Sequence, residues 1–238
     1  MNRRLVSVGL ALVAGLPAAW AQKPEGRTYA PGRFDAIEIS GSADVRFSQG
    51  ANDQVFVEGG DDVQAGVSVV VRDGRLHIGP SGAWKFWGSR KVRIEVTARD
   101  LTRVSISGAA DFLAAAPVRA DRLSVNISGA GSARLDQLTA ESLSFQVSGS
   151  GDGQVSGMSK ELVLKISGRS EFRGENLRTD RGRVSIAGLG DVEVWAVQEL
   201  EISVAGAGKV QYWGAPSVRR HVTGAATITD RGAKPEPR

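Results

Sequence analysis

The sequence contains no cysteine and only two histidines, His77 and His221. Without cysteine the fold can form no disulfide, so its stability must come from packing and hydrogen bonding alone. The two histidines lie far apart in the sequence, which gives no support to a histidine-bound zinc ion or to a Ser-His-Asp triad. We therefore predict no metal site, no cofactor and no catalytic residues.

Neither sign of charge dominates, and long hydrophobic runs are scarce. The chain has 30 basic and 26 acidic residues, a net charge of +4, and the two signs are interspersed. This pattern lacks the basic patch of a nucleic-acid-binding protein. The apolar run at residues 5–16 is shorter than the roughly 20 residues that span a bilayer. We predict no nucleic-acid partner and no transmembrane segment in the mature chain.

Residues 1–21 have the features of a secretory signal peptide. Two arginines precede the apolar run, Pro17 follows it, and residues 19–21 read Ala-Trp-Ala, an A-x-A cleavage site. The mature chain is expected to begin at Gln22, with a linker over 22–30. Because no cysteine follows the apolar run, we expect no lipid anchor.

Glycine is abundant, with 30 residues, and it recurs in one Ser-Gly context that marks an internal repeat. From the second repeat onward the spacing between these glycines is 18 to 21 residues. The repeated glycines are Gly41, Gly108, Gly129, Gly149, Gly168, Gly188, Gly206 and Gly224.

Within each repeat, apolar and polar residues alternate with the period of a β-strand. Leu143, Phe145 and Val147 are predicted to point inward, with Ser144 and Gln146 outward. Each repeat thus predicts two short strands joined at a Ser-Gly corner, and stacking the repeats about 4.8 Å apart buries one continuous core. We expect the glycine to supply a positive φ and the serine to hydrogen-bond the backbone of its own turn.

The predicted fold is all-β: a parallel β-helix, or β-solenoid, with about 18–21 residues per rung and an N-terminal antiparallel cap. A single domain over 31–230 is expected, with the cap at 31–100, rungs at 101–230 and a disordered tail at 231–238. Strands of the cap are predicted at 55–58, 67–72, 75–79 and 92–97, and Asp73-Gly74 predicts a tight hairpin.

Residues 34–41 read Phe-Asp-Ala-Ile-Glu-Ile-Ser-Gly, and a hairpin and serial Ser-Gly-x-Gly-Asp repeats follow. This order resembles the putative auto-transporter adhesin head GIN domain family over about residues 30–230. The resemblance implies an exported β-solenoid of the bacterial envelope, and the family name implies adhesion. An auto-transporter also carries a membrane β-barrel, for which the residues after the last repeat are too few. We therefore expect a free periplasmic protein, with secretion or surface display as alternatives.

One column of the repeat, three residues after each glycine, is rich in acidic side chains. In-register stacking would place neighbouring carboxylates about 5 Å apart, near the separation found in retaining glycosidases. The alternative is that each carboxylate closes its corner turn by accepting backbone hydrogen bonds, which we favour because the position recurs in nearly every rung. The Gly-x-Gly-Asp runs are too incomplete for a calcium-binding β-roll. The acidic column contains Asp111, Asp152, Glu171 and Asp191.

Tryptophans are the candidate binding residues. Trp195 and Trp213 both lie seven residues after their glycine, so they are predicted to stack as neighbours on an exposed face that suits a sugar ring. Trp84 and Trp87 lie in a glycine-bounded insertion that either binds a ligand or plugs the solenoid. In both cases a purely stabilising role is the alternative.

The favoured function is a non-catalytic, adhesin-like envelope protein that binds a glycan or a partner protein along one solenoid face. A polysaccharide lyase or hydrolase that uses the acidic column is the first alternative, and a structural scaffold is the second. No oligomeric state is predicted.

Overall fold

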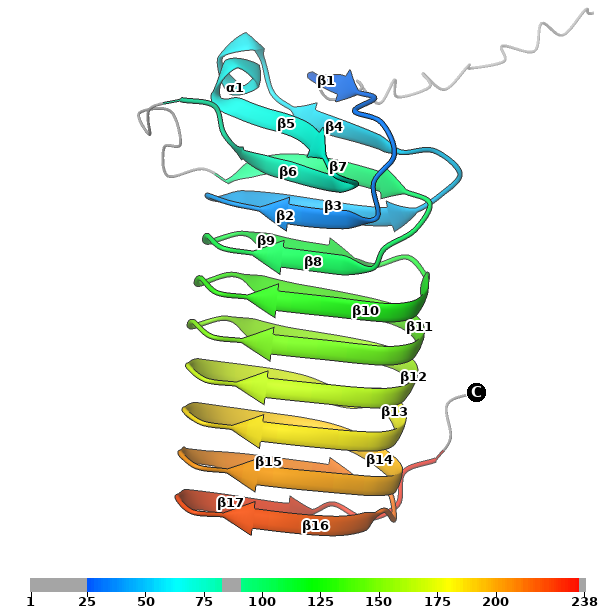
Figure 1. Cartoon of the computed structure of the whole chain (residues 1–238), viewed down its shortest axis with the longest axis vertical. Coiled ribbons are helices and arrows are strands. Elements are labelled where there is room, and N and C mark those ends of the chain that lie inside the picture. Colours follow the sequence, from blue (N-terminus) through cyan, green and yellow to red (C-terminus); the bar gives the residue numbers. More distant parts are fainter. Residues whose placement is uncertain (1–24, 83–90, 236–238) are drawn as a thin grey trace, which may run out of the picture.

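The computed structural model describes residues 25–82 and 91–235, and it shows a tall stack of flat coils with a broader cap at the N-terminal end (Figure 1). The strands of successive coils lie directly over one another, and the stack has about six turns. The all-β solenoid predicted from the repeat is thereby confirmed. The signal peptide and the loop with Trp84 and Trp87 lie outside the described residues.

The elements follow the chain as β1 (Gly26–Tyr29), β2 (Ala36–Ile39), β3 (Ala43–Gln49), β4 (Gln54–Glu58), α1 (Asp61–Gly66), β5 (Val67–Arg72), β6 (Arg75–Pro80), β7 (Val92–Ala98), β8 (Arg103–Ile106), β9 (Asp111–Ala114), β10 (Val118–Ile127), β11 (Ser132–Val147), β12 (Asp152–Ile166), β13 (Arg169–Ile186), β14 (Leu189–Val204), β15 (Ala207–Trp213), β16 (Ser217–Val222) and β17 (Ala225–Asp230).

Parallel, in-register pairing from coil to coil builds the core. β11 and β12 pair so that Leu143 lies beside Leu162, Phe145 beside Leu164 and Val147 beside Ile166. All six side chains are buried, as the alternation predicts. Because every coil repeats the pattern, like positions form continuous apolar columns between the two legs of the coils.

The corner glycines stack as predicted, but the expected reason for glycine is wrong. Only Gly41 of the column has a positive φ. A Cβ atom on Gly129 would lie 2.0 Å from the carbonyl oxygen of Gly108, and one on Gly149 would lie 2.1 Å from that of Gly129. Each of these carbonyls accepts a hydrogen bond from the residue after the next corner glycine, as Ala130 N–H donates to Gly108 at 3.0 Å. Glycine is required because successive corners approach too closely for a side chain.

The serines before these glycines also act between coils rather than within their own turn. The Ser107 hydroxyl lies 3.3 Å from the carbonyl oxygen of Ile39, and the Ser128 hydroxyl lies 3.3 Å from that of Ile106. In each case the acceptor belongs to the preceding coil. The expected local turn bond is therefore replaced by a contact that supports stacking.

The cap combines parallel and antiparallel pairings. β2 and β3 form a first coil, on which β8 and β9 stack from one side and β6 and β7 from the other. β4 pairs antiparallel with β1 and β7, and β5 with β6. The predicted cap strands agree with β4, β5, β6 and β7 to within one residue at each end, and Asp73 and Gly74 form the hairpin turn with positive φ. Sequence analysis missed α1. No helix in the described residues is long and apolar enough to cross a bilayer.

The C-terminal end of the stack is closed by polar side chains. Within the described residues no strand pairs with the outer edges of β16 and β17. In this last coil Arg220 stands in register with the core residue Ile202, and Asp230 with Tyr212. Arg220 donates to the Tyr212 hydroxyl at 3.0 Å, and that hydroxyl donates to Asp230 at 3.1 Å. Charged residues at core positions of an edge coil disfavour pairing with another sheet.

The residues that follow β17 contact the preceding coil. The Arg231 N–H donates to the Tyr212 carbonyl at 2.9 Å, and the Gly214 N–H donates to the Gly232 carbonyl at 2.9 Å. The domain boundaries proposed from the sequence stay predictions.

Replacing both polar closing residues, in Arg220→Leu with Asp230→Val, should make the chain associate through its C-terminal end, because the last coil then offers open strand edges over an apolar surface. Size-exclusion chromatography with light scattering measures the molar mass. Arg219→Leu is the matched control, since Arg219 points outward and pairs with Glu199 at 2.8 Å. An unchanged mass for the double variant, with the fold intact, would contradict this role.

Candidate functional site

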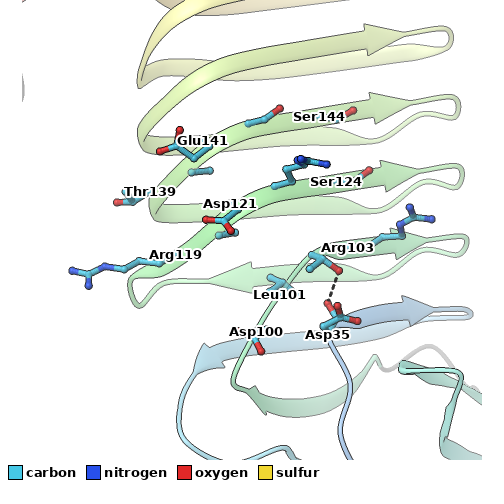
Figure 2. A pocket seen from close by; sticks show the side chains of 15 residues that line it. Asp35, Asp100, Leu101, Arg103, Arg119, Asp121, Ser124, Thr139, Glu141 and Ser144 are labelled. Carbon is cyan, nitrogen blue, oxygen red and sulfur yellow. Dashed lines mark hydrogen bonds between the residues drawn. The ribbon is translucent and has the colours of Figure 1, made fainter.

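A polar groove of about 940 Å³ lies beside the cap, on the face formed by β8, β10 and β11 (Figure 2). We call it the polar groove. It is lined by Asp35, residues 100–103, residues 119–122, Ser124, residues 139–142 and Ser144.

The groove exists because the chain changes direction there. After β7 the chain passes back across the edge of the first coil and begins β8 on its other side. Residues 99–102 make this passage. The Thr102 N–H donates to the carbonyl of Asp35, the residue just before β2, at 2.7 Å. The regular corner is therefore interrupted at this point, and the hollow forms between the passage and the next two coils.

Charged and hydroxyl side chains from three successive coils surround the groove. Figure 2 shows Asp35 and Asp100 near the passage, Arg103 and Asp121 on the next coils, and Glu141 beyond them. Its apolar side chains are the buried Leu101 and Ala140 and the half-buried Ala120. A ligand in this groove would thus meet hydrogen-bonding groups from most of the lining residues.

The charges of the groove are only partly paired. Asp100 pairs with Arg33 at 3.3 Å, and Glu141 pairs with Lys160 at 2.5 Å. The guanidinium groups of Arg103, Arg119 and Arg122 form no ion pair with any residue that the structure describes.

Sequence analysis missed this groove. A signal was present, because Asp121-Arg122 and Glu141-Ser142 each stand just before an apolar strand leg, at the corner opposite the glycine. What the sequence did not show is the passage from β7 to β8, which turns two ordinary polar corners into the wall of a hollow.

The acidic column is in register, as predicted. Asp111 pairs in the sheet with Ser132, Ser132 with Asp152, and Glu171 with Asp191. Asp152 accepts a hydrogen bond from the Glu171 N–H at 2.9 Å. The favoured explanation, that a carboxylate accepts backbone hydrogen bonds, is thus seen at Asp152, but the donor belongs to the next coil and not to its own corner.

Two other carboxylates of the column, those of Glu171 and Asp111, are bound by side chains. Arg173 donates to Glu171 at 2.7 Å. Asp111 accepts hydrogen bonds from Lys91 and, at 2.6 Å, from the Ser132 hydroxyl. Partial burial raises the pKa of Asp111, but the hydrogen bonds from Lys91 and Ser132 and the Lys91 charge outweigh it, so the net shift is downward. The pKa of Lys91 is raised, mainly by its hydrogen bond to Asp111.

The expectation of two exposed tryptophans is wrong. Trp195 and Trp213 are neighbours in the sheet, as predicted, but Trp195 is only 3% exposed and Trp213 is half-buried. The register shifts between β13 and β14, where Gly174 pairs with Val194 and Arg178 with Trp195, so β13 has three additional residues beside this ring. Lys234 also lies over both rings.

The described residues contain no cluster of three or more histidine or acidic side chains that could hold a metal ion.

The fold and groove define a class of protein, a capped parallel β-solenoid with a polar groove beside its cap. The chain belongs to the family described as putative auto-transporter adhesin, head GIN domain, whose model matches residues 33–216. The resemblance found in the sequence is thereby confirmed. Adhesin-type domains of this kind are features of exported or envelope proteins.

Solved structures share the fold. A putative adhesin from Bacteroides fragilis is similar with a TM-score of 0.83 at 24% identity, over 88% of this chain and 98% of that chain. A putative lipid binding protein from Parabacteroides distasonis gives 0.67 at 19% identity, over 88% and 97%. A putative adhesin from the same species gives 0.64 at 20% identity, over 87% and 97%. No curated protein matches this chain.

The Asp111→Asn variant should be less stable than the wild type near pH 7, because it loses the ion pair with Lys91. The folded pKa of Asp111 is lowered, so its charge contributes stability above the ordinary value of 3.8 and loses that contribution as the pH falls through the folded pKa. Urea unfolding between about pH 7 and about pH 2.5 should therefore show the difference shrink at the acidic end.

Asp121→Asn is the matched control, because the structure gives the Asp121 carboxylate no side-chain partner among the described residues. If Asp111→Asn lowers the free energy of unfolding by the same amount down to the lowest pH, the hydrogen-bond geometry of Asp111, and not its charge, sets its contribution to stability.

Proposed function

We propose that this protein is a non-catalytic binding protein of the bacterial envelope that holds a carbohydrate chain in the polar groove. The observation that carries this proposal is the lining of the groove, which combines hydroxyl and carboxylate groups, guanidinium groups without an ion pair among the described residues, and few apolar side chains. Sugars present closely spaced hydroxyls, and each hydroxyl both donates and accepts. Carboxylates accept such bonds, and the fork of a guanidinium group donates two at once.

A protein partner is less well supported by this surface. Protein interfaces depend on a few large aromatic, aliphatic or arginine anchors that become desolvated at the centre of the contact. The groove offers arginines, but its only large apolar residue, Leu101, is 1% exposed. The groove runs across three coils, which suits an extended chain of sugar units.

The alternative of a polysaccharide lyase or hydrolase draws less support from the acidic column. A glycosidase needs one carboxyl group that is kept protonated by an apolar surrounding. Here Asp152 accepts a backbone hydrogen bond and Glu171 pairs with Arg173, both on an open face. The Asp152 contact joins two coils and favours a role in stacking them, whereas the Glu171–Arg173 pair lies within β13.

The compartment and the loop tryptophans belong to the same proposal. The signal peptide over residues 1–21 and the family membership support export, and we place the mature chain in the periplasm. Trp84 and Trp87 remain candidates for stacking on a sugar ring.

The test is binding of mature residues 22–238 to an array of bacterial envelope oligosaccharides, compared with the groove variant Arg122→Gln with Asp121→Asn. Wild-type protein should bind a defined set of glycans, and the variant should bind them at least about tenfold more weakly, because two groups that contact the ligand are lost. Arg183→Gln is the matched control, since Arg183 lies outside the groove and pairs with Glu201 at 2.8 Å.

Equal losses in the groove and control variants would contradict the location. Cleavage of a glycan that disappears in Asp152→Asn or Glu171→Gln would assign the enzyme alternative. Binding to no glycan at all would contradict the proposal and favour a structural scaffold.

A further inference from the structure

Lys234 occupies a corner between two tryptophans at the C-terminal end of the stack. Its ammonium nitrogen lies 5.3 Å from the centroid of the Trp195 ring and 5.6 Å from that of Trp213. It also donates hydrogen bonds to the Glu175 carbonyl and, at 2.9 Å, to the Asn176 side-chain oxygen. Among residues 231–235 it is the one that is half-buried, whereas its neighbours are exposed.

The fold constructs this corner from an irregularity. β13 has three residues more than β14 between the pairs Gly174–Val194 and Arg178–Trp195. This excess places the Glu175 carbonyl and the Asn176 amide beside the tryptophans, where a regular coil would have none. We call the two rings with these two oxygens the tryptophan corner.

The tryptophan corner has the chemistry of a cation site. An ammonium group within about 6 Å of an indole ring is attracted by the negative face of that ring, and the effect grows when the cation is partly desolvated. The two oxygens accept the N–H groups of a primary ammonium. The Glu175 carboxylate belongs to the same corner: its Oε2 atom is buried and accepts no hydrogen bond within the described residues, and its Oε1 atom accepts one from the Asn176 side-chain nitrogen at 2.9 Å.

We propose that the tryptophan corner is a binding site for organic ammonium groups, and that Lys234 fills it from within the same chain. Lys234 is tethered close by, because the Gly232 carbonyl accepts the Gly214 N–H at 2.9 Å. A tether this short gives an effective concentration in the millimolar range or above. A free primary ammonium ligand, such as an amino sugar, therefore enters when Lys234 leaves.

The experiment is calorimetric titration of mature residues 22–238 with glucosamine, whose amino group is a primary ammonium near neutral pH. Lys234→Gln should bind glucosamine at least about tenfold more tightly than the wild type, since the competing ammonium is gone. Lys234→Arg is the matched control, because it keeps a cation of similar reach and should stay closed. In the Lys234→Gln background, Trp213→Leu keeps an apolar side chain but removes the aromatic face, and should abolish the gain.

A second measurement uses only the wild-type protein, so it does not depend on whether a variant folds. In the wild type, the Lys234 side-chain protons next to the ammonium should resonate upfield in carbon–proton NMR spectra, because they lie over two indole rings. An ordinary lysine position for these signals would overturn the proposal. So would a folded Lys234→Gln variant that binds glucosamine no better than the wild type, or a gain that survives Trp213→Leu.

Discussion

The close contact between corner glycines of successive coils sets the register of the whole stack. Each corner carbonyl accepts the N–H that follows the next glycine, as between Gly168 and Leu189 at 2.9 Å. No Cβ atom fits into this contact, since one on Gly188 would lie 2.1 Å from the Gly168 oxygen. With the corners fixed, inward residues form apolar columns and outward residues form the acidic column.

The candidate binding sites and the closure of the last coil lie where the repeat is interrupted. The polar groove forms where the chain passes from β7 back to β8, and the tryptophan corner forms where β13 has three additional residues between two of its pairs with β14. The polar closure of the last coil forms where Arg220 and Asp230 take core positions. Regular coils supply the frame, and each departure from regularity brings together polar or aromatic groups that the repeat alone would not place side by side.

This division explains what the sequence could predict. The alternation around Phe145 and the recurrence of Gly149 and its equivalents are local patterns, so the solenoid, its register and its cap strands followed from them. The order of coils in the cap depends on a passage that no local pattern shows, so the groove was missed. Trp195 was assigned to an exposed face by counting from Gly188, because the count assumed coils of equal length at that corner.

The central claim, that steric closeness and not backbone conformation requires the corner glycines, is tested by comparing Gly188→Ala with Gly190→Ala in urea unfolding. A Cβ atom on Gly190 would lie 3.3 Å from the nearest atoms, which are side-chain methyls of Ile166 and Ile186 that can yield. Gly188→Ala should lose about 3 kcal/mol or more of unfolding free energy, because the coils must separate, and Gly190→Ala less than about 1.5 kcal/mol. Similar losses at the two positions would contradict the account.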